Sequence, residues 1–203
     1  EYADWWVESL EYYMSKGIVI DYVSIQNEVD FSPSSYEGCR FAPFETDEYA
    51  GYAEAFIAVY DAFQEAFGAD APILIGPETM SCSPADMISY VTPIVENRPE
   101  SLGGLAYHLY VGGTSDENTN TVKVSSYLSS FTGLETYFPD TKKWQTEFWV
   151  GQGLETAELI WSSLNNAEMN AYIYWSAIWA DSTPDRFDSA DLMEINNSGE
   201  WRL

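Results

Sequence analysis

The most constraining feature of this sequence is a regular alternation of short apolar runs with longer amphipathic stretches. The short runs are rich in β-branched and aromatic residues, which favours strands, whereas the longer stretches show helical spacing. Strands are predicted at residues 18–26, 73–75, 105–110, 143–148 and 171–179. Because each of the first four is followed by a predicted helix, the pattern indicates a parallel sheet whose crossovers are helical.

The helical stretches are bounded by recognisable start and stop residues. One helix precedes the first strand at residues 2–16, and a second is expected from a cap at Thr46 to a stop at Gly68. Further helices are predicted at residues 84–95 and 156–165, and around an apolar face formed by Val124, Tyr127, Leu128 and Phe131. Polar loops are expected from Gly112 to Asn120 and in the tail after Ala180.

Two architectures fit this order, the (β/α)₈ barrel and the doubly wound open sheet. The open sheet usually carries a glycine-rich phosphate loop after a strand, and Gly112-Gly113 reads only as a turn. Polar side chains stand instead at four strand ends: Glu28, Glu78, His108 and Glu147. Barrel enzymes place their sites at that face. We therefore predict a single α/β domain of (β/α)₈ TIM-barrel type at residues 1–203, partial because five strands are found rather than eight.

Composition narrows the possible partners. The formal net charge is −25, with 8 Lys and Arg against 33 Asp and Glu, which disfavours nucleic acid. No apolar run is long enough to span a membrane, so no span is expected. A single histidine and two cysteines make a zinc site improbable, and we expect no metal and no cofactor. Cys39 and Cys82 would form one bridge if the chain is secreted, a pairing that the sequence leaves open.

Two carboxylates at predicted strand ends indicate a chemistry. Glu28 follows Asn27 at the end of the first strand, and Glu147 ends the fourth. If the strands are parallel, both lie at one edge of the sheet. Glycoside hydrolysis needs two carboxyl groups facing each other across a sugar, one to donate a proton and one to attack or to activate water. The pair therefore predicts a glycosidase, although the sequence does not supply the distance between the two groups.

Longer segments make the prediction more specific. The stretches YVSIQNEVDF, AYHLY, WQTEFW and AYIYWSAIW resemble glycoside hydrolase family 30, especially its xylanase branches. The resemblance runs from about residue 1 to 200 and would cover the third helix through the eighth strand of that barrel. It implies a retaining, extracellular endo-β-1,4-xylanase acting on xylan or glucuronoxylan. The alternatives within the family are β-glucosidase, glucosylceramidase and β-1,6-glucanase activity.

The resemblance also implies roles for individual residues. Glu28 would be the general acid/base, Glu147 the nucleophile, and Asn27 the partner of the sugar 2-hydroxyl. Four side chains would line the sugar subsites: His108, Tyr110, Trp149 and Trp175. The residues alone leave alternatives open, because His108 and the two tryptophans would equally suit a barrel core. Glu78 either hydrogen-bonds within the cleft or is a buried, paired acid.

The chain departs from the family in two ways. Val29 stands where the family has proline after its Asn-Glu pair, which leaves the catalytic atoms in place. The family's first three strands, its last helix and its side β-domain have no counterpart in this sequence. A polysaccharide is the expected partner, and the missing strands would come from another chain or from a swapped copy. The hypothesis from a different class is a carbohydrate-binding barrel fragment that does no chemistry.

Overall fold

The computed structural model describes residues 1–34, 38–176, 178–180, 193–195 and 201–202, and its centre is a parallel sheet. The strand order is β1-β2-β3-β6-β7, and each neighbouring pair is parallel. The strands are β1 Tyr22–Val23, β2 Ile73–Ser81, β3 Gly104–Val111, β6 Lys143–Glu147 and β7 Ala171–Tyr172. The predicted α/β fold is confirmed: five parallel strands with intervening helices form a half-barrel of TIM-barrel type.

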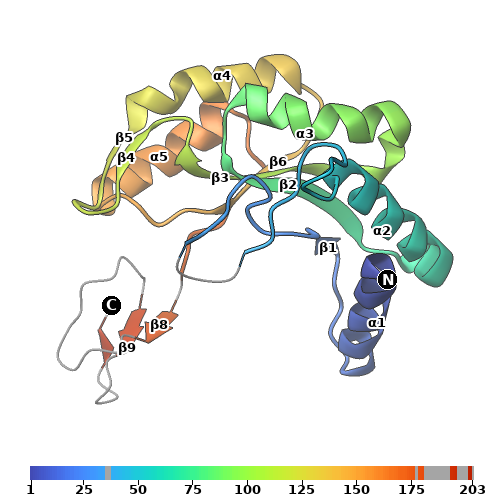
Figure 1. The fold of residues 1–203 in the computed structure, drawn as a ribbon. Helices are drawn as coiled ribbons and strands as arrows, with labels where there is room; N and C mark the ends of the chain where they lie inside the picture. Colours follow the sequence, from blue (N-terminus) through green and yellow to red (C-terminus); the bar gives the residue numbers. More distant parts are fainter. Residues whose placement is uncertain (35–37, 177, 181–192, 196–200, 203) are drawn as a thin grey trace.

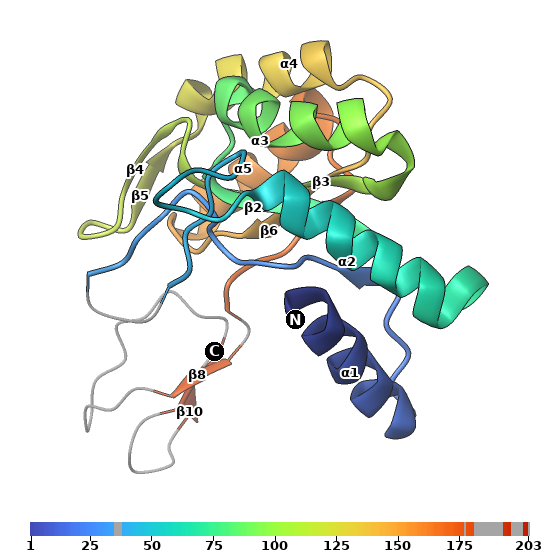
Figure 2. The same cartoon turned by 45° about the vertical axis from the view of Figure 1, so that its right-hand side comes forward.

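Helices cover one face of this sheet (Figures 1 and 2). They are α1 Tyr2–Ser15, α2 Tyr52–Phe67, α3 Pro84–Asn97, α4 Leu128–Tyr137 and α5 Gly153–Asn166. Short 3-10 turns lie at Gly68–Asp70, Pro99–Ser101 and Val124–Tyr127. One apolar cluster joins α1, α2 and α3 to β1 and β2, and a second joins α3, α4 and α5 to β3 and to Phe148 and Val150, which follow β6. Burial of this face therefore holds the strands in place.

The opposite face of the sheet is concave. Tyr22 on β1 and Trp144 on β6 have ring centroids 4.5 Å apart, although β2 and β3 lie between these strands in the sheet. Side chains three strands apart meet in this way only if the sheet curves around them. The curvature turns the carboxyl ends of the strands toward a common centre.

Three of the predicted strands have different lengths in the structure. The first, expected at 18–26, is reduced to Tyr22–Val23, because β2 is its only partner among the described residues. The second extends from the expected 73–75 to Ile73–Ser81, since β3 pairs along most of its length. The last, expected at 171–179, ends at Tyr172, and residues 178–180 belong to a separate sheet.

Two further expectations about local structure are wrong. Thr46 does not cap a helix: its Oγ1 accepts the amides of Glu48 and Tyr49, at 3.2 and 2.9 Å, which closes a turn. Helix α2 begins six residues later at Tyr52. The expected loop from Gly112 instead carries a hairpin of β4 Thr114–Asp116 and β5 Thr121–Lys123, where β-branched residues recur.

The C-terminal part of the chain contains a separate, smaller sheet. The tail after Ala180, predicted as a loop, contains β9 Met193–Ile195 and β10 Trp201–Arg202, which form one sheet with β8 Ile178–Ala180. Both cysteines are free, with Cys39 exposed and Cys82 buried, so the bridge considered from the sequence is not formed in this structure. None of the helices in the described part of the chain has the length and apolar character to cross a bilayer.

A buried ion pair at the amino end of β6 supplies a test of this packing. The Lys143 side chain is 1% exposed, and its Nζ donates to Glu135 Oε2 at 2.8 Å. Replacing Glu135 with Gln should lower the free energy of unfolding by about 3 kcal/mol, because the lysine charge stays buried without its partner. Urea denaturation would measure the change. Glu65→Gln, on the exposed side of α2, is the control and should stay within about 0.5 kcal/mol of wild type.

Candidate active site

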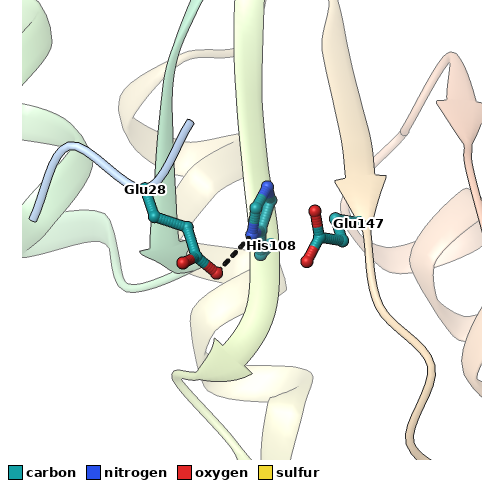
Figure 3. A group of neighbouring side chains, drawn as sticks. All are labelled: Glu28, His108 and Glu147. Atoms are coloured by element: carbon teal, nitrogen blue, oxygen red, sulfur yellow. Dashed lines mark ion pairs between the residues drawn. The ribbon is translucent and has the colours of Figure 1, made fainter. Parts of the chain in front are cut away.

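The carboxyl ends of the central strands bring the predicted polar residues together. Glu28 follows β1, Glu78 lies within β2, His108 lies within β3, and Glu147 is the last residue of β6. Figure 3 shows the imidazole of His108 between the carboxylates of Glu28 and Glu147. Residues that are far apart in the sequence therefore form one cluster, because parallel strands all end at the same edge.

Irregular backbone aims these side chains inward. The register of β2 against β3 shifts on either side of Thr79, next to Glu78, and that of β3 against β6 shifts between Tyr107 and His108. Such bulges re-aim side chains and are frequent beside active sites. Glu28 and Glu78 also have φ values of 50° and 61°, in the left-handed region that side-chain-bearing residues rarely adopt. Each such residue costs about 1–3 kcal/mol, and Asn120 and Glu168, outside the cluster, share this conformation at φ 48°.

Hydrogen bonds attach the segment of Glu28 to the bulged part of β2. The Glu28 amide donates to the Glu78 carbonyl at 2.8 Å. In the reverse direction, the Met80 amide donates to Asp30 Oδ1 at 2.9 Å. The loop after β1 therefore follows β2 closely, and the Glu28 carboxylate is held over the next strand.

His108 is the centre of the cluster. Its side chain is 1% exposed, with Nδ1 3.4 Å from Glu28 Oε1 and Nε2 3.4 Å from Glu78 Oε2. Nδ1 meets Glu28 at ion-pair distance without the alignment of a hydrogen bond. Burial alone would lower the pKa of His108, but Glu28, Glu78 and the charge of Glu147 outweigh it and raise the pKa to about 9. The imidazole is thus positively charged at neutral pH.

For Glu147, burial raises the pKa instead of lowering it. It is half-buried, and burial together with the charges of Glu28 and Glu78 raises its pKa, while the charge of His108 and a hydrogen bond from Tyr110 oppose the rise. The Tyr110 hydroxyl donates to Glu147 Oε1 at 3.2 Å. Burial and the charge of Glu147 raise the pKa of Tyr110, so this hydroxyl keeps its proton and remains a donor.

The separation of the two carboxylates fits one class of chemistry. One oxygen of Glu28, one nitrogen of His108 and one oxygen of Glu147 all lie within 4.8 Å of one another. Retaining glycosidases hold their carboxyl groups roughly 5–5.5 Å apart, and inverting enzymes roughly 6.5–9.5 Å. A metal ion among these groups would need the neutral imidazole. Here the imidazolium supplies the positive charge that such an ion would bring.

The other predicted site residues are Asn27, Trp149 and Trp175, and their surroundings differ. Asn27 is exposed and lines a cavity of about 370 Å³ beside α1, together with Tyr2, Trp5 and Trp6 among others. Trp149 is half-buried and packs against the apolar cluster under the helices. Trp175 is 41% exposed, and its amide donates to the Phe148 carbonyl at 3.3 Å. The structure thus brings together Glu28, Glu78, His108, Tyr110 and Glu147, and it leaves Asn27 and the two tryptophans around them.

Two contributors were not found from the sequence. The Thr146 hydroxyl donates to Glu78 Oε2, and Asp30 holds the bulged strand as described above. Thr146 immediately precedes Glu147, and Asp30 lies two residues after Glu28. The signal available was therefore only proximity to a strand end, which many polar residues share.

Comparison with solved structures identifies the fold. SrfJ from Salmonella typhimurium superposes on 99% of this chain with a TM-score of 0.67 at 16% identity, using 44% of its own length. The glycoside hydrolase family 30 subfamily 8 xylanase Xyn30A from Clostridium acetobutylicum matches 87% of this chain with a TM-score of 0.55 at 20% identity, using 39% of its length. A GH30 endoxylanase from Clostridium papyrosolvens C71 matches 88% with a TM-score of 0.56 at 18% identity, using 40% of its length.

These comparisons support a barrel of the glycoside hydrolase type and no finer statement. No family model matches the sequence, and no curated protein matches it either. The chain spans less than half the length of each of the three structures. The likeness to family 30 inferred from sequence motifs is therefore confirmed at the level of the fold.

The charge state of the single histidine can be measured directly. We expect the NMR titration of His108 to have a midpoint near pH 9 in the folded chain. In the urea-unfolded chain, which serves as the control, it should lie near the ordinary value of about 6.5. Because the folded pKa is the higher one, the stability from this group is present below about pH 6.5 and is lost as the pH rises through about 9. A folded-state midpoint near 6.5 would contradict the arrangement.

Proposed function

We propose that this chain is the catalytic part of a retaining glycoside hydrolase that cleaves β-linked polysaccharide. The observation that carries the proposal is the pair of carboxylates, Glu28 and Glu147, with oxygens within 4.8 Å of one another at the carboxyl edge of a half-barrel. That separation is close to the spacing of double-displacement enzymes. Residues 1–203 would form one partial domain, equivalent to the third helix through the eighth strand of a complete barrel.

In the first step, Glu28 is the acid and Glu147 the nucleophile. The Glu147 carboxylate attacks the anomeric carbon while Glu28 gives its proton to the oxygen of the leaving sugar. The bond from the anomeric carbon to that oxygen breaks, and an ester to Glu147 forms. The Tyr110 hydroxyl bound to Glu147 Oε1 orients the attacking carboxylate.

In the second step, Glu28 acts as the base. Its carboxylate takes a proton from water, and the water oxygen attacks the anomeric carbon. The ester bond breaks, Glu147 leaves as a carboxylate, and the anomeric configuration is restored by the second inversion. His108, with Nδ1 3.4 Å from Glu28 Oε1, faces the carboxylate that forms in each cycle.

We further propose an endo-β-1,4-xylanase acting on xylan or glucuronoxylan. The sequence motifs resemble the xylanase branches, and two of the matched structures are described as xylanases. β-Glucosidase, glucosylceramidase and β-1,6-glucanase activity are the alternatives of the same type. Because a plant-wall polymer is too large to enter a cell, the enzyme would act extracellularly.

The two edge strands of the half-barrel, β1 and β7, are relevant to this proposal. Among the described residues, β1 pairs only with β2, and β7 pairs only with β6. Unpaired edges favour pairing with further strands, and we propose another chain or a swapped copy as one source of them. A carbohydrate-binding fragment without chemistry is the competing function, and the unpaired edges of β1 and β7 among the described residues favour it.

The first test is hydrolysis with and without the proposed nucleophile. Reducing-sugar release should be seen with plain xylan or glucuronoxylan but not with β-1,6-glucan. Glu147→Gln should lower the rate by about a thousandfold or more, since the attacking group is lost. Glu65→Gln is the matched control and should keep wild-type activity. Binding without release, unaltered in Glu147→Gln, would instead establish the competing fragment.

A second test separates the two carboxylates. Glu28→Gln should slow cleavage of a polysaccharide by about 10²–10⁴-fold, because a sugar alcohol leaves poorly without a proton donor. The first step on a nitrophenyl β-xylobioside should be affected far less, since nitrophenolate needs no protonation. Equal losses on both substrates would show that Glu28 is not the acid. Proton NMR of the initial product should show the β-anomer, and an α-anomer would overturn the retaining mechanism.

A further inference from the structure

Glu78 has a place in the cluster that the two proposed catalytic carboxylates do not account for. It lies beside the bulge of β2 with a φ of 61°, and the residue is only 6% exposed. Glu147 is more exposed to solvent than Glu78, and its carboxylate accepts a hydrogen bond from the Tyr110 hydroxyl. A buried acid in a rarely adopted backbone conformation is costly to maintain, so a role in the site is expected of it.

The contacts of Glu78 are with other members of the cluster. Its Oε2 lies 3.4 Å from His108 Nε2, and the Thr146 hydroxyl donates to the same oxygen. Thr146 also lies 3.4 Å from the Tyr107 carbonyl, so strand β6 locates this hydroxyl between β2 and β3. The Glu78 carboxylate is thereby fixed on the far side of the imidazole from Glu28.

The two ring nitrogens of His108 consequently face two different carboxylates. A neutral imidazole carries only one N–H and would turn a lone pair toward one of them. In the imidazolium both nitrogens carry a proton, and each lies at ion-pair distance, 3.4 Å, from a carboxylate oxygen: Nδ1 from Glu28 and Nε2 from Glu78. Two carboxylates on opposite sides of one ring favour its charged form, although Nδ1 is not aligned for a hydrogen bond to Glu28.

Three carboxyl groups of the described residues act on the His108 ring. Glu28 comes from the loop after β1, Glu78 from β2 and Glu147 from β6, while Tyr110 from β3 is a neutral neighbour 5.8 Å from the ring. One positive charge thus stands among three carboxyl groups. Loss of Glu78 would remove the partner of Nε2 and leave the charges on Glu28 and Glu147.

We propose that Glu78 is a positioning residue, which holds the His108 imidazolium at Nε2 and so presents Nδ1 to the Glu28 carboxylate. This inference rests on the proposed function, since ionised Glu28 is the base of the second step. There the carboxylate takes a proton from water as the water oxygen binds the anomeric carbon and the ester to Glu147 breaks.

The first arm of the test is independent of hydrolysis. In Glu78→Gln, a near-isosteric change, the NMR midpoint of the single histidine should fall by roughly one pH unit or more, because an opposite charge is lost. Thr146→Val should shift it in the same direction by less, and Thr146→Ser should restore the wild-type midpoint. Glu65→Gln is the charge-matched control and should leave it unchanged. An unchanged midpoint in folded Glu78→Gln overturns the proposal.

The second arm of the test measures kcat and kcat/KM of the hydrolysis. Nitrophenolate leaves without a proton, so the second step, where Glu28 is the base, is expected to limit kcat with nitrophenyl β-xylobioside. Glu78→Gln should then lower kcat by roughly tenfold and change kcat/KM less. A fallen histidine midpoint with unaltered kcat would overturn the role of Glu78 in the reaction.

The two arms also distinguish the proposals from one another. If no substrate is cleaved by wild type, the proposed function fails, while the histidine titration still decides whether Glu78 holds the ring. If Glu78→Gln does not fold, Thr146→Val and Thr146→Ser carry the titration, since they loosen the same carboxylate without altering a charge. Equal midpoints in those two variants would then overturn the proposal.

Discussion

Parallel pairing of β2, β3 and β6 is the constraint on which the rest of this structure depends. Parallel strands need a crossover between them, and here each crossover is a helix that buries its apolar face against the same side of the sheet. The consequence is that every strand ends at the same edge. Four polar residues that are spread over more than half of the chain therefore lie together at this edge: Glu28, Glu78, His108 and Glu147.

The site is built where this regularity is interrupted. Bulges beside Glu78 and His108, and left-handed backbone at Glu28 and Glu78, turn polar side chains into a region where water has little access. Burying three carboxyl groups together is unfavourable, and the charged ring of His108 offsets much of that cost. The helix-covered face supplies the stability that allows such strain at the edge.

The sequence predicted the elements that rest on local chemistry. Strand β3 is a mostly apolar run, and α3 begins with a proline in its first turn, so their positions were expected closely. The mostly polar β6 also lies within one residue of its expected bounds. Prediction was wrong where two local patterns compete. Thr46 suits a helix cap and an isolated turn equally well, and the second was selected because the chain at Ala42 pairs with Gly51 before α2 begins. The extents of β1 and β7 depend on which strands lie beside them, which no single segment contains.

For the candidate site, the sequence by itself determined which residues are available: two carboxylates and one histidine at the ends of predicted strands, in a family-like order. Residue type and strand position are local properties, so they can be read along the chain. Only the tertiary structure decided that one carboxylate oxygen of Glu28 and one of Glu147 lie within 4.8 Å of each other, that Glu78 pairs with His108, and that Thr146 donates to Glu78. Distances between strands and the burial that shifts a pKa arise from curvature and packing, which depend on the whole sheet at once.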